Sequence, residues 1–150
     1  MTFKKSAQRT IAYDSRPHYV DVVDINNDIH LDIIVANTGA DSVGIFFGNG
    51  HGLFQDQIMY SAGDRSTPVS VAHGYFNNDT RADLIVAFYG INCIGVLIAN
   101  DNGSFRSPII ISLRASRPIT LAVADFNPCT TTLSLTVCKT ANELHKLMTI

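Results

Sequence analysis

The chain has 150 residues, a length typical of one folded domain, and carries a net charge of −2 with only 11 Lys and Arg residues. This charge argues against nucleic acid as a partner, because phosphate binding needs a basic surface. All but one of the 13 acidic residues are Asp, which favours turns over helix interiors, and the apolar residues are mainly Val, Ile, Leu and Phe. The composition is therefore typical of a β protein with many tight turns.

The amino-terminal residues, MTFKKSAQRT, lack the apolar segment of a signal peptide. No apolar run approaches the ~18 residues of a membrane span, so we expect no membrane-spanning segment. The three cysteines, Cys93, Cys129 and Cys138, are odd in number and form no CxxC pair. They indicate neither a disulfide framework nor a zinc site.

The central part of the chain is an internal repeat. Residues 15–64 align without a gap with residues 66–115, at a shift of 51 residues. The matching pairs include Pro17 with Pro68, Asp32 with Asp83 and Gly44 with Gly95. A repeat of this length predicts a propeller or a solenoid.

Each copy reads as four short strands separated by Asp, Asn and Gly turns. The predicted strands are residues 18–23, 32–37, 43–48 and 56–61 in the first copy, and 69–74, 83–88, 94–99 and 108–113 in the second. Four strands in about 50 residues is the size of a β-propeller blade. We therefore predict an all-β fold: a partial β-propeller with about two full four-stranded antiparallel blades, 15–64 and 66–115, and partial blades at each end.

Propellers close with about four to eight blades, so this chain does not close a ring alone. We expect either a piece of a longer propeller or several copies that self-associate through open blade edges. The fragment is the simpler explanation, because Met1 falls inside a repeat.

A third copy opens with Pro118, Val123 and Asp125, but the repeat pattern is lost from Pro128. We therefore assign residues 1–127 to the repeats and 128–150 to a degenerate tail. In the tail, CTTTLSLTVCKT is compatible with a strand or two. The segment TANELHKLM, residues 140–148, has the capping-box pattern of Thr140 and Glu143, which predicts a short terminal helix that caps the open end; the alternative is an unstructured end.

The stretch DINNDIHLD, residues 24–32, precedes a predicted strand and has the chemistry of a calcium loop. Ca²⁺ takes six to eight oxygens from carboxylates, amides, backbone carbonyls and water. Such oxygens fall at positions 1, 3, 5 and 9, and position 7 offers a backbone carbonyl: Asp24, Asn26, Asp28, Asp32 and His30. An EF-hand is excluded because position 12 is not Glu. The alternative is an Asx-turn cluster without metal, which repulsion among three carboxylates disfavours.

The repeats resemble the FG-GAP/VCBS repeat of integrin-α-like propellers. The resemblance rests on VDVVDINNDIHLDIIVAN and VGIFFGNGHGLF and on their second copies, VAHGYFNNDTRADLIVAF and IGVLIANDNGSF. In that family the loop between the first two strands of a blade binds Ca²⁺, which implies a structural calcium ion on Asp24, Asn26, Asp28 and Asp32 with the His30 carbonyl. The family often has Gly at position 6, where this chain has Ile29, and a positive φ there would strain Ile29.

The second loop keeps fewer of these oxygens. Tyr75 stands at position 1, which leaves Asn77, Asp79 and Asp83 as a weaker second site. For this loop, a turn motif without metal is favoured over a calcium site.

No nucleophile motif occurs and no Gly-rich loop leads into a helix, so we expect no enzyme activity. The resemblance implies a non-enzymatic, calcium-stabilised propeller fragment of adhesion or recognition type, extracellular, with an unknown protein or carbohydrate ligand. Two alternatives remain open. One is a non-catalytic propeller segment of a larger extracellular enzyme or lectin, and the other is a degenerate fragment without autonomous function.

Overall fold

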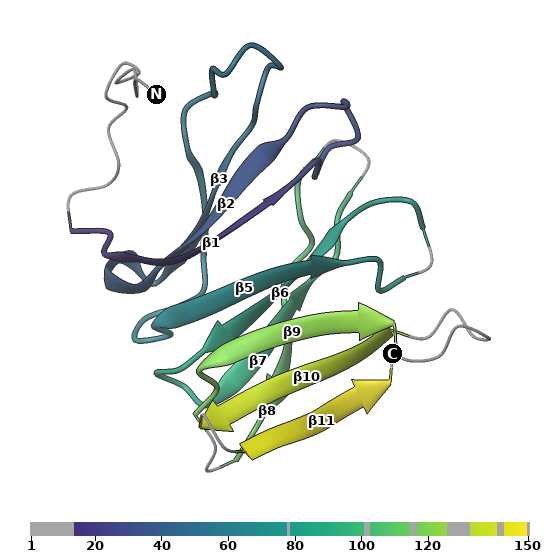
Figure 1. Cartoon of the computed structure of the whole chain (residues 1–150). Coiled ribbons are helices and arrows are strands. Elements are labelled where there is room, and N and C mark those ends of the chain that lie inside the picture. The colour runs from purple at the N-terminus through teal and green to yellow at the C-terminus, as the bar shows by residue number, and fades with distance from the viewer. Residues whose placement is uncertain are drawn as a thin grey trace, which may run out of the picture.

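In the computed structural model, the described backbone covers residues 14–77, 79–100, 103–114, 117–125, 133–140 and 143–149, with side chains as far as Val123. These residues form three antiparallel sheets that follow one another along the chain (Figure 1). Sheet 1 contains β1 (Pro17–Val23), β2 (Asp32–Asn37), β3 (Ser42–Phe46) and β4 (Ile58–Ser61). Sheet 2 contains β5 (Pro68–Gly74), β6 (Asp83–Phe88), β7 (Cys93–Leu97) and β8 (Ile109–Ser112). Sheet 3 contains β9 (Thr120–Asp125), β10 (Leu133–Thr140) and β11 (Glu143–Thr149).

The sequence repeat is a structural repeat. In sheets 1 and 2 each strand pairs with the next one along the chain, and the pairing register is the same in both. Val35 lies opposite Gly44 in sheet 1, as Val86 lies opposite Gly95 in sheet 2. All eight predicted strands are present, which confirms the predicted all-β class and the two four-stranded sheets.

Strands β3 and β7 end earlier than predicted. Beyond them, Gly48 pairs with Phe54 and Ala99 pairs with Phe105 in isolated bridges. The chain therefore turns back on itself in a small loop before β4 and β8 begin. A 3-10 turn, η1 (Thr38–Ala40), connects β2 to β3.

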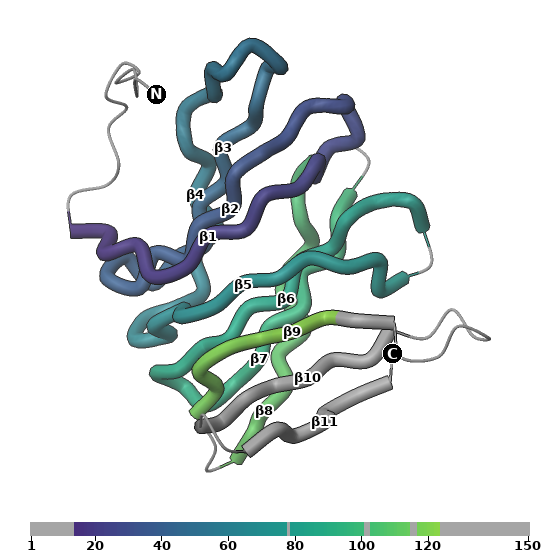
Figure 2. The backbone as a smooth tube through the Cα atoms, in the orientation of Figure 1, coloured from purple at the N-terminus to yellow at the C-terminus, as the bar shows by residue number. Residues whose placement is uncertain are grey.

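The first strands of the three sheets lie side by side, with β5 between β1 and β9 (Figure 2). Hydrogen bonds join the neighbours: a ring nitrogen of His18 lies 2.7 Å from the Val69 carbonyl oxygen, and the Leu121 N–H donates to Ser70 Oγ at 3.3 Å. The sheets thus radiate from a common line of first strands.

The core has two layers, one on each face of sheet 2. Between sheets 1 and 2, Ile34 and Ile45 pack with Val71, Leu84 and Phe88. On the other face, towards sheet 3, the cluster includes residues of sheet 2 and of β9, namely Ile85, Ile94, Val96 and Leu121. Burial on both faces explains why β6, DLIVAF, is almost wholly apolar, a pattern usual for strands covered on both sides.

The predicted helix at residues 140–148 is wrong. Residues 143–149 form β11, which pairs antiparallel with β10, and β10 pairs with β9. A capping box contributes only about 1 kcal/mol, and an isolated helix shorter than ~12 residues is marginal in water. The free edge of β10 offers a row of backbone hydrogen bonds, and these outweigh the local helix signal. The prediction of a strand in CTTTLSLTVCKT is confirmed by β10.

The partial blade predicted at the amino-terminal end falls on residues 1–13, which lie outside the described residues. Over the part of the chain that is described, no helix has the length and apolar character needed to cross a membrane.

Candidate metal centre

The predicted calcium loop joins β1 to β2 and is held by hydrogen bonds from its own backbone. Asp24 accepts the Asp28 N–H at 3.1 Å on one carboxylate oxygen and the Ile29 N–H at 2.8 Å on the other. The Asp28 N–H also lies 3.1 Å from Asn26 Oδ1. The loop therefore wraps around Asp24 and Asn26 as Asx turns do.

Asp28 completes this small network. Its carboxylate accepts the Asn26 side-chain N–H₂ at 2.9 Å and the His30 backbone N–H at 2.9 Å. The Asn26 amide, and after it the His30 N–H, lower the pKa of Asp28, so the carboxylate stays ionised near neutral pH. The structure thus brings together the oxygen-bearing side chains of positions 1, 3 and 5.

Asp32, at position 9, is engaged differently. Its side chain is fully buried, and its two oxygens accept the N–H groups of Ile25 at 2.9 Å and Gly48 at 2.8 Å. Burial raises the pKa of Asp32 against the opposing effect of these two hydrogen bonds, and the charges of Asp28 and Asp24 raise it further. Asp32 therefore ties the loop after β1 to the loop after β3.

Asp83 makes the same connection in the second repeat. It is fully buried and accepts the N–H groups of Phe76 and Ala99, both at 2.8 Å. Sequence reasoning assigned Asp32 and Asp83 only as metal ligands and missed this bracing role. A signal was present, since Asp83 persists in a loop where Tyr75 has replaced the first Asp.

The backbone strain expected at position 6 is confirmed. Ile29 has a φ of 67° and its side chain is 90% exposed, so no packing compensates for the left-handed conformation. A β-branched residue is a true outlier in this region of φ/ψ space, where glycine is favoured. Asn27, two residues earlier, also has a positive φ of 60°, which Asn tolerates better.

The predicted ligands of the first loop do not form a closed coordination sphere in this structure. Within the described residues, no group of three or more His, Cys, Asp or Glu side chains is close enough to hold a metal ion. Asp24, Asn26 and Asp28 cluster, whereas both Asp32 oxygens bond to backbone N–H groups. The ring of His30 lies against Gly50, where an added Cβ would be 2.7 Å from the imidazole. A carboxylate oxygen has two lone pairs, so an N–H bond leaves one available to a cation.

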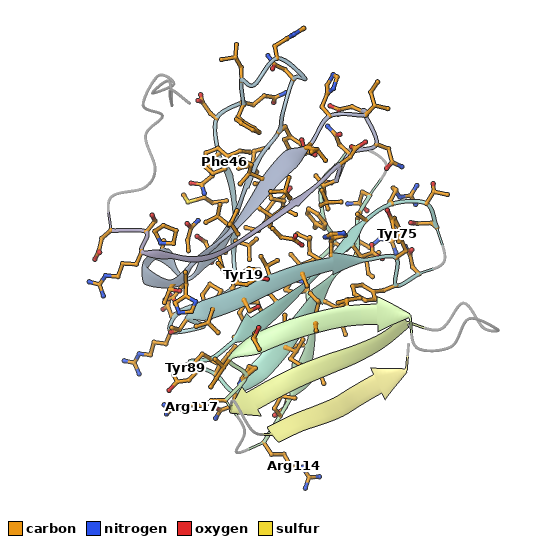
Figure 3. The ribbon with its side chains drawn as sticks, in the orientation of Figure 1. Tyr19, Phe46, Tyr75, Tyr89, Arg114 and Arg117 are labelled. Carbon is orange, nitrogen blue, oxygen red and sulfur yellow. The ribbon has the colours of Figure 1, made fainter. Side chains whose placement is uncertain are left out.

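The second loop, between β5 and β6, contains a cation of its own. Asp79 accepts the Asn77 side-chain N–H₂ at 2.7 Å and the Arg81 backbone N–H at 2.8 Å. The Arg81 guanidinium forms an ion pair with the same carboxylate. The Arg81 N–H, then the Asn77 amide and the Arg81 charge, outweigh desolvation and lower the pKa of Asp79. Tyr75, at position 1, is exposed at the end of β5 (Figure 3).

The two loops lie at the same end of their sheets and touch. The Asn27 side chain donates to the Thr80 carbonyl at 3.1 Å, across the boundary between the repeats. Arg81 occupies the position in the second repeat that His30 occupies in the first. The two copies therefore present neighbouring loops of similar shape. In the second loop the Arg81 guanidinium pairs with the central carboxylate, whereas in the first loop the residue at this position, His30, directs its ring towards Gly50.

Comparison with known proteins identifies the repeat. Residues 24–86 match the family model of the FG-GAP-like repeat. A solved structure, BBS1N in complex with ARL6DN and soaked with lead, aligns with 98% of this chain at 11% sequence identity and a TM-score of 0.41. The chain spans 59% of the length of the chain in that structure. No curated protein shows a significant match.

Proposed function

The chain carries an FG-GAP-like repeat over residues 24–86, and from this premise we propose that it is a non-enzymatic β-propeller segment whose first loop binds one structural Ca²⁺. The ligands are Asp24, Asn26, Asp28 and Asp32 with the backbone carbonyl of His30. The ion compensates the repulsion between the clustered carboxylates and fixes the β1–β2 hairpin. Its role is to stabilise the fold.

The contrast between the two loops supports this assignment most directly. In the second loop the Arg81 guanidinium neutralises Asp79. Over the described residues, no Lys or Arg forms a salt bridge with Asp24 or Asp28. The first loop thus gathers carboxylate and amide oxygens without a guanidinium or ammonium partner, and these are the ligands that Ca²⁺ prefers.

We propose that the second loop, with Asn77, Asp79 and Asp83, works without metal. Its internal ion pair already supplies the positive charge that a cation would bring, and Asp83 is occupied by two backbone N–H groups. Binding Ca²⁺ there would require the Arg81 guanidinium to leave Asp79.

Calcium binding in the first loop is expected to be weak. The oxygens of Asp24 and Asn26 now accept backbone N–H groups and must be shared or reoriented, and Ile29 occupies a position suited to glycine. Extracellular modules bind Ca²⁺ with dissociation constants of roughly 10⁻⁴–10⁻³ M, and we place this loop in that range.

The loop end of the sheets is suited to recognition. Ile29 and Tyr75 are exposed there on neighbouring loops, and an aromatic and an apolar side chain at this end of the sheets offer contact surface for a protein or a carbohydrate. We therefore place the chain in an extracellular adhesion or recognition molecule, where millimolar Ca²⁺ would fill the loop.

The test is thermal unfolding in millimolar Ca²⁺ and in chelator, with Mg²⁺ as an ion control. At free Ca²⁺ about tenfold above Kd, linkage stabilises the protein by ~1.4 kcal/mol, or about 3–6 °C in Tm. Asp28→Ala should remove this shift. Asp79→Ala changes the matching residue of the second repeat and should retain it. No calcium-dependent shift in the wild type, or equal loss in both variants, would contradict the proposal.

A further inference from the structure

The loop between β3 and β4 contains a labile amide, and we propose that Asn49 is a site of spontaneous deamidation. The sequence contains two Asn–Gly pairs, Asn49–Gly50 in the first repeat and Asn102–Gly103 in the second. Glycine after Asn favours this reaction, because it has no side chain to hinder the approach of its backbone nitrogen to the Asn amide. The surroundings of the two glycines differ and favour the reaction at Asn49. The proposal does not depend on calcium binding.

The reaction proceeds through a cyclic imide. The Gly50 amide loses its proton to a base in the solvent, and its nitrogen attacks the Cγ atom of Asn49 to form a new C–N bond. The intermediate expels the side-chain nitrogen as ammonia and becomes a succinimide. Water then opens the new C–N bond to give aspartate at position 49, or opens the backbone C–N bond to give isoaspartate. In total one water is consumed, one ammonia is released, and a neutral amide becomes a carboxylate.

Two features of the first loop prepare Asn49 for this attack. The Asn49 Oδ1 accepts the His51 N–H at 3.1 Å, which is the hydrogen bond of an Asx turn. This bond holds the side-chain carbonyl over the Asn49–Gly50 peptide, and it draws electron density away from the carbon to be attacked. The Gly50 N–H makes no hydrogen bond to any residue that the structure describes. Its proton is therefore available to a base.

The loop does not have to unfold for the reaction to occur. The Asn49 N–H donates to the Leu53 carbonyl at 3.1 Å, and the Gly48 N–H donates to Asp32 at 2.8 Å. Neither bond involves the Asn49 side chain or the Gly50 nitrogen. These bonds fix the backbone around the reacting atoms, so the imide can form in the folded protein.

The nitrogen of Gly103, in the second pair, is already engaged. Its N–H donates to the Asn100 carbonyl at 3.2 Å. Gly103 is buried, and an added Cβ would lie 3.1 Å from the Asn26 side chain and 3.4 Å from the Phe47 ring. Attack on Asn102 therefore requires this hydrogen bond to break in a closely packed segment. We expect deamidation of Asn102 to be about five- to tenfold slower, since a hydrogen bond of ordinary strength must open first.

Asn100 occupies the position in the second repeat that Asn49 occupies in the first, but it precedes Asp101. Its side-chain amide has two partners of its own. The Nδ2 donates to Ser104 Oγ at 2.9 Å, and the Oδ1 accepts the Arg106 Nε–H at 3.3 Å. Without glycine after it and with its amide held in place, Asn100 should stay intact.

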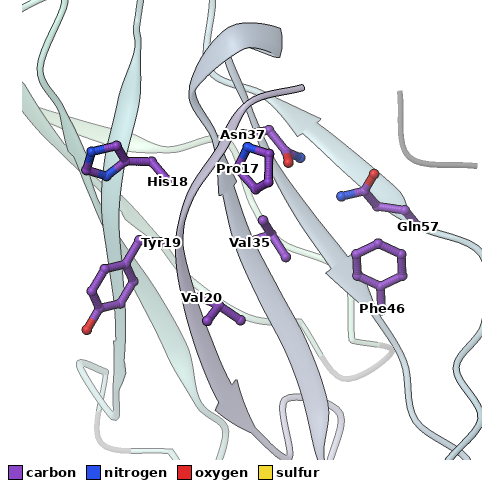
Figure 4. A pocket seen from close by; sticks show the side chains of 8 residues that line it. All are labelled: Pro17, His18, Tyr19, Val20, Val35, Asn37, Phe46 and Gln57. Atoms are coloured by element: carbon purple, nitrogen blue, oxygen red, sulfur yellow. The ribbon is translucent and has the colours of Figure 1, made fainter. Parts of the chain in front are cut away.

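Asn37 provides a second reference, inside sheet 1. It is fully buried, in a groove that is also lined by Pro17 and Gln57 (Figure 4). The residue after it, Thr38, has a branched side chain, and its N–H donates to the Arg16 carbonyl at 3.2 Å. Asn37 should therefore also stay intact.

The product adds a negative charge at the loop end of sheet 1. Gly50, next to the modified residue, lies against the ring of His30, where an added Cβ would be 2.7 Å from the imidazole. The new carboxylate thus lies beside the loop that contains Asp24 and Asp28. Deamidation makes this end of the sheet more acidic.

The test is ageing of the whole chain in chelator at mildly alkaline pH, followed by proteolytic peptide mapping with mass spectrometry. A cooperative urea transition first establishes that the chain is folded. Each deamidation raises the mass of one peptide by one dalton, and chromatography separates the isoaspartate product. We expect Asn49 to react about five- to tenfold faster than Asn102, with Asn100 and Asn37 unchanged. In concentrated urea the two Asn–Gly pairs should react at equal rates, because the folded contacts are lost.

A matched pair of variants checks the assignment by ammonia release. Asn49→Gln should remove the fast phase of release from the folded chain, whereas Asn100→Gln should retain it. Equal rates at Asn49 and Asn102 in the folded chain, or a faster reaction at Asn102, would overturn the proposal. So would an Asn49 that reacts in urea but not in the folded chain, since the loop would then protect the amide. The calcium-dependent shift in Tm is measured on freshly prepared protein, so its loss would contradict only the metal assignment.

Discussion

A ring nitrogen of His73 in β5 lies 2.7 Å from a carboxylate oxygen of Asp21 in β1, and this contact links the two repeats. The hydrogen bond to Asp21, opposed by burial and aided by the Asp21 charge, raises the pKa of His73. For Asp21, burial acts to raise the pKa, but the hydrogen bond and charge of His73 outweigh it and the pKa is lowered. The pair is therefore an ion pair in mildly acidic solution.

We expect this pair to make stability depend on pH. The His73 contribution is complete below its unfolded pKa of 6.5 and is lost as pH rises through the raised folded value. The Asp21 contribution is present above 3.8 and is lost as pH falls through the lowered folded value. Between these limits His73→Gln should lower the free energy of unfolding by up to ~1 kcal/mol, since the pair is partly exposed. Urea unfolding at about pH 5.5 and about pH 9 measures the difference.

A suitable control is His51→Gln, which changes an exposed side chain in the loop before β4. The difference between wild type and His73→Gln should shrink at the higher pH, while His51→Gln should follow the wild type throughout. A constant difference across pH would show that His73 acts through packing alone.

Ile29→Gly should stabilise the protein. The φ of 67° is unfavourable for a β-branched residue by about 1–2 kcal/mol, and the exposed side chain makes little packing contribution. Part of this gain is offset by the greater backbone freedom of glycine in the unfolded chain, which leaves an increase of about 0.5–1 kcal/mol in the free energy of unfolding. Denaturant unfolding in chelator measures it without any effect of metal.

The matched control for this change is Thr80→Gly in the second repeat. Thr80 is not among the described residues with positive φ, so glycine relieves no strain there and should be neutral or destabilising. Stabilisation of equal size at both positions would contradict the assignment of strain to Ile29.

Asp32→Ala should be strongly destabilising even without metal. Removal of the carboxylate leaves the N–H groups of Ile25 and Gly48 unpaired at a buried site, with an expected loss of about 2–4 kcal/mol. Asp83→Ala should have a similar effect, since it removes the acceptor of the Phe76 and Ala99 N–H groups. Asp64→Ala, at an exposed turn, provides the baseline for loss of a surface charge. Chemical denaturation in chelator should show a much larger loss in the free energy of unfolding for both buried positions than for Asp64→Ala.

His30→Arg should abolish the calcium response. It places in the first loop the residue that neutralises Asp79 in the second, so a guanidinium would compete with Ca²⁺ for Asp28. The calcium-dependent shift in Tm should disappear, while stability in chelator should be equal to the wild type or higher. His51→Arg adds the same charge outside the loop and should keep the shift. A full shift in His30→Arg would mean that Asp28 is not a calcium ligand.

The strands could be predicted from the sequence because their signals are local and occur twice. Short apolar runs bounded by Asp, Asn and Gly turns located β2 and β6 with the correct limits, at 32–37 and 83–88. The helix predicted at 140–148 failed because the capping-box pattern describes only its own segment, whereas the preceding strand β10 offers a backbone edge with which residues 143–149 pair as a hairpin. Local pattern does not report which backbone edge is free.

The site was only partly predictable for a similar reason. Spacing alone grouped Asp24, Asn26 and Asp28, which the loop indeed brings together. The partners of Asp32 lie in another loop, at Gly48, so its bracing role became visible only in three dimensions.

The buried carboxylates hold the hairpin together independently of the residues at the loop tip, although a calcium loop usually combines these two tasks. Asp32 and Asp83 hold their hairpins together through backbone N–H groups, whether the tip of the loop carries Asp24 or Tyr75, His30 or Arg81. The tip can therefore change its charge, its metal dependence or its surface without loss of the hairpin beneath it. In a tandem array this allows each copy to diverge in what it displays while its neighbours still pack, so variation in the loops is tolerated and variation at the buried Asp is not.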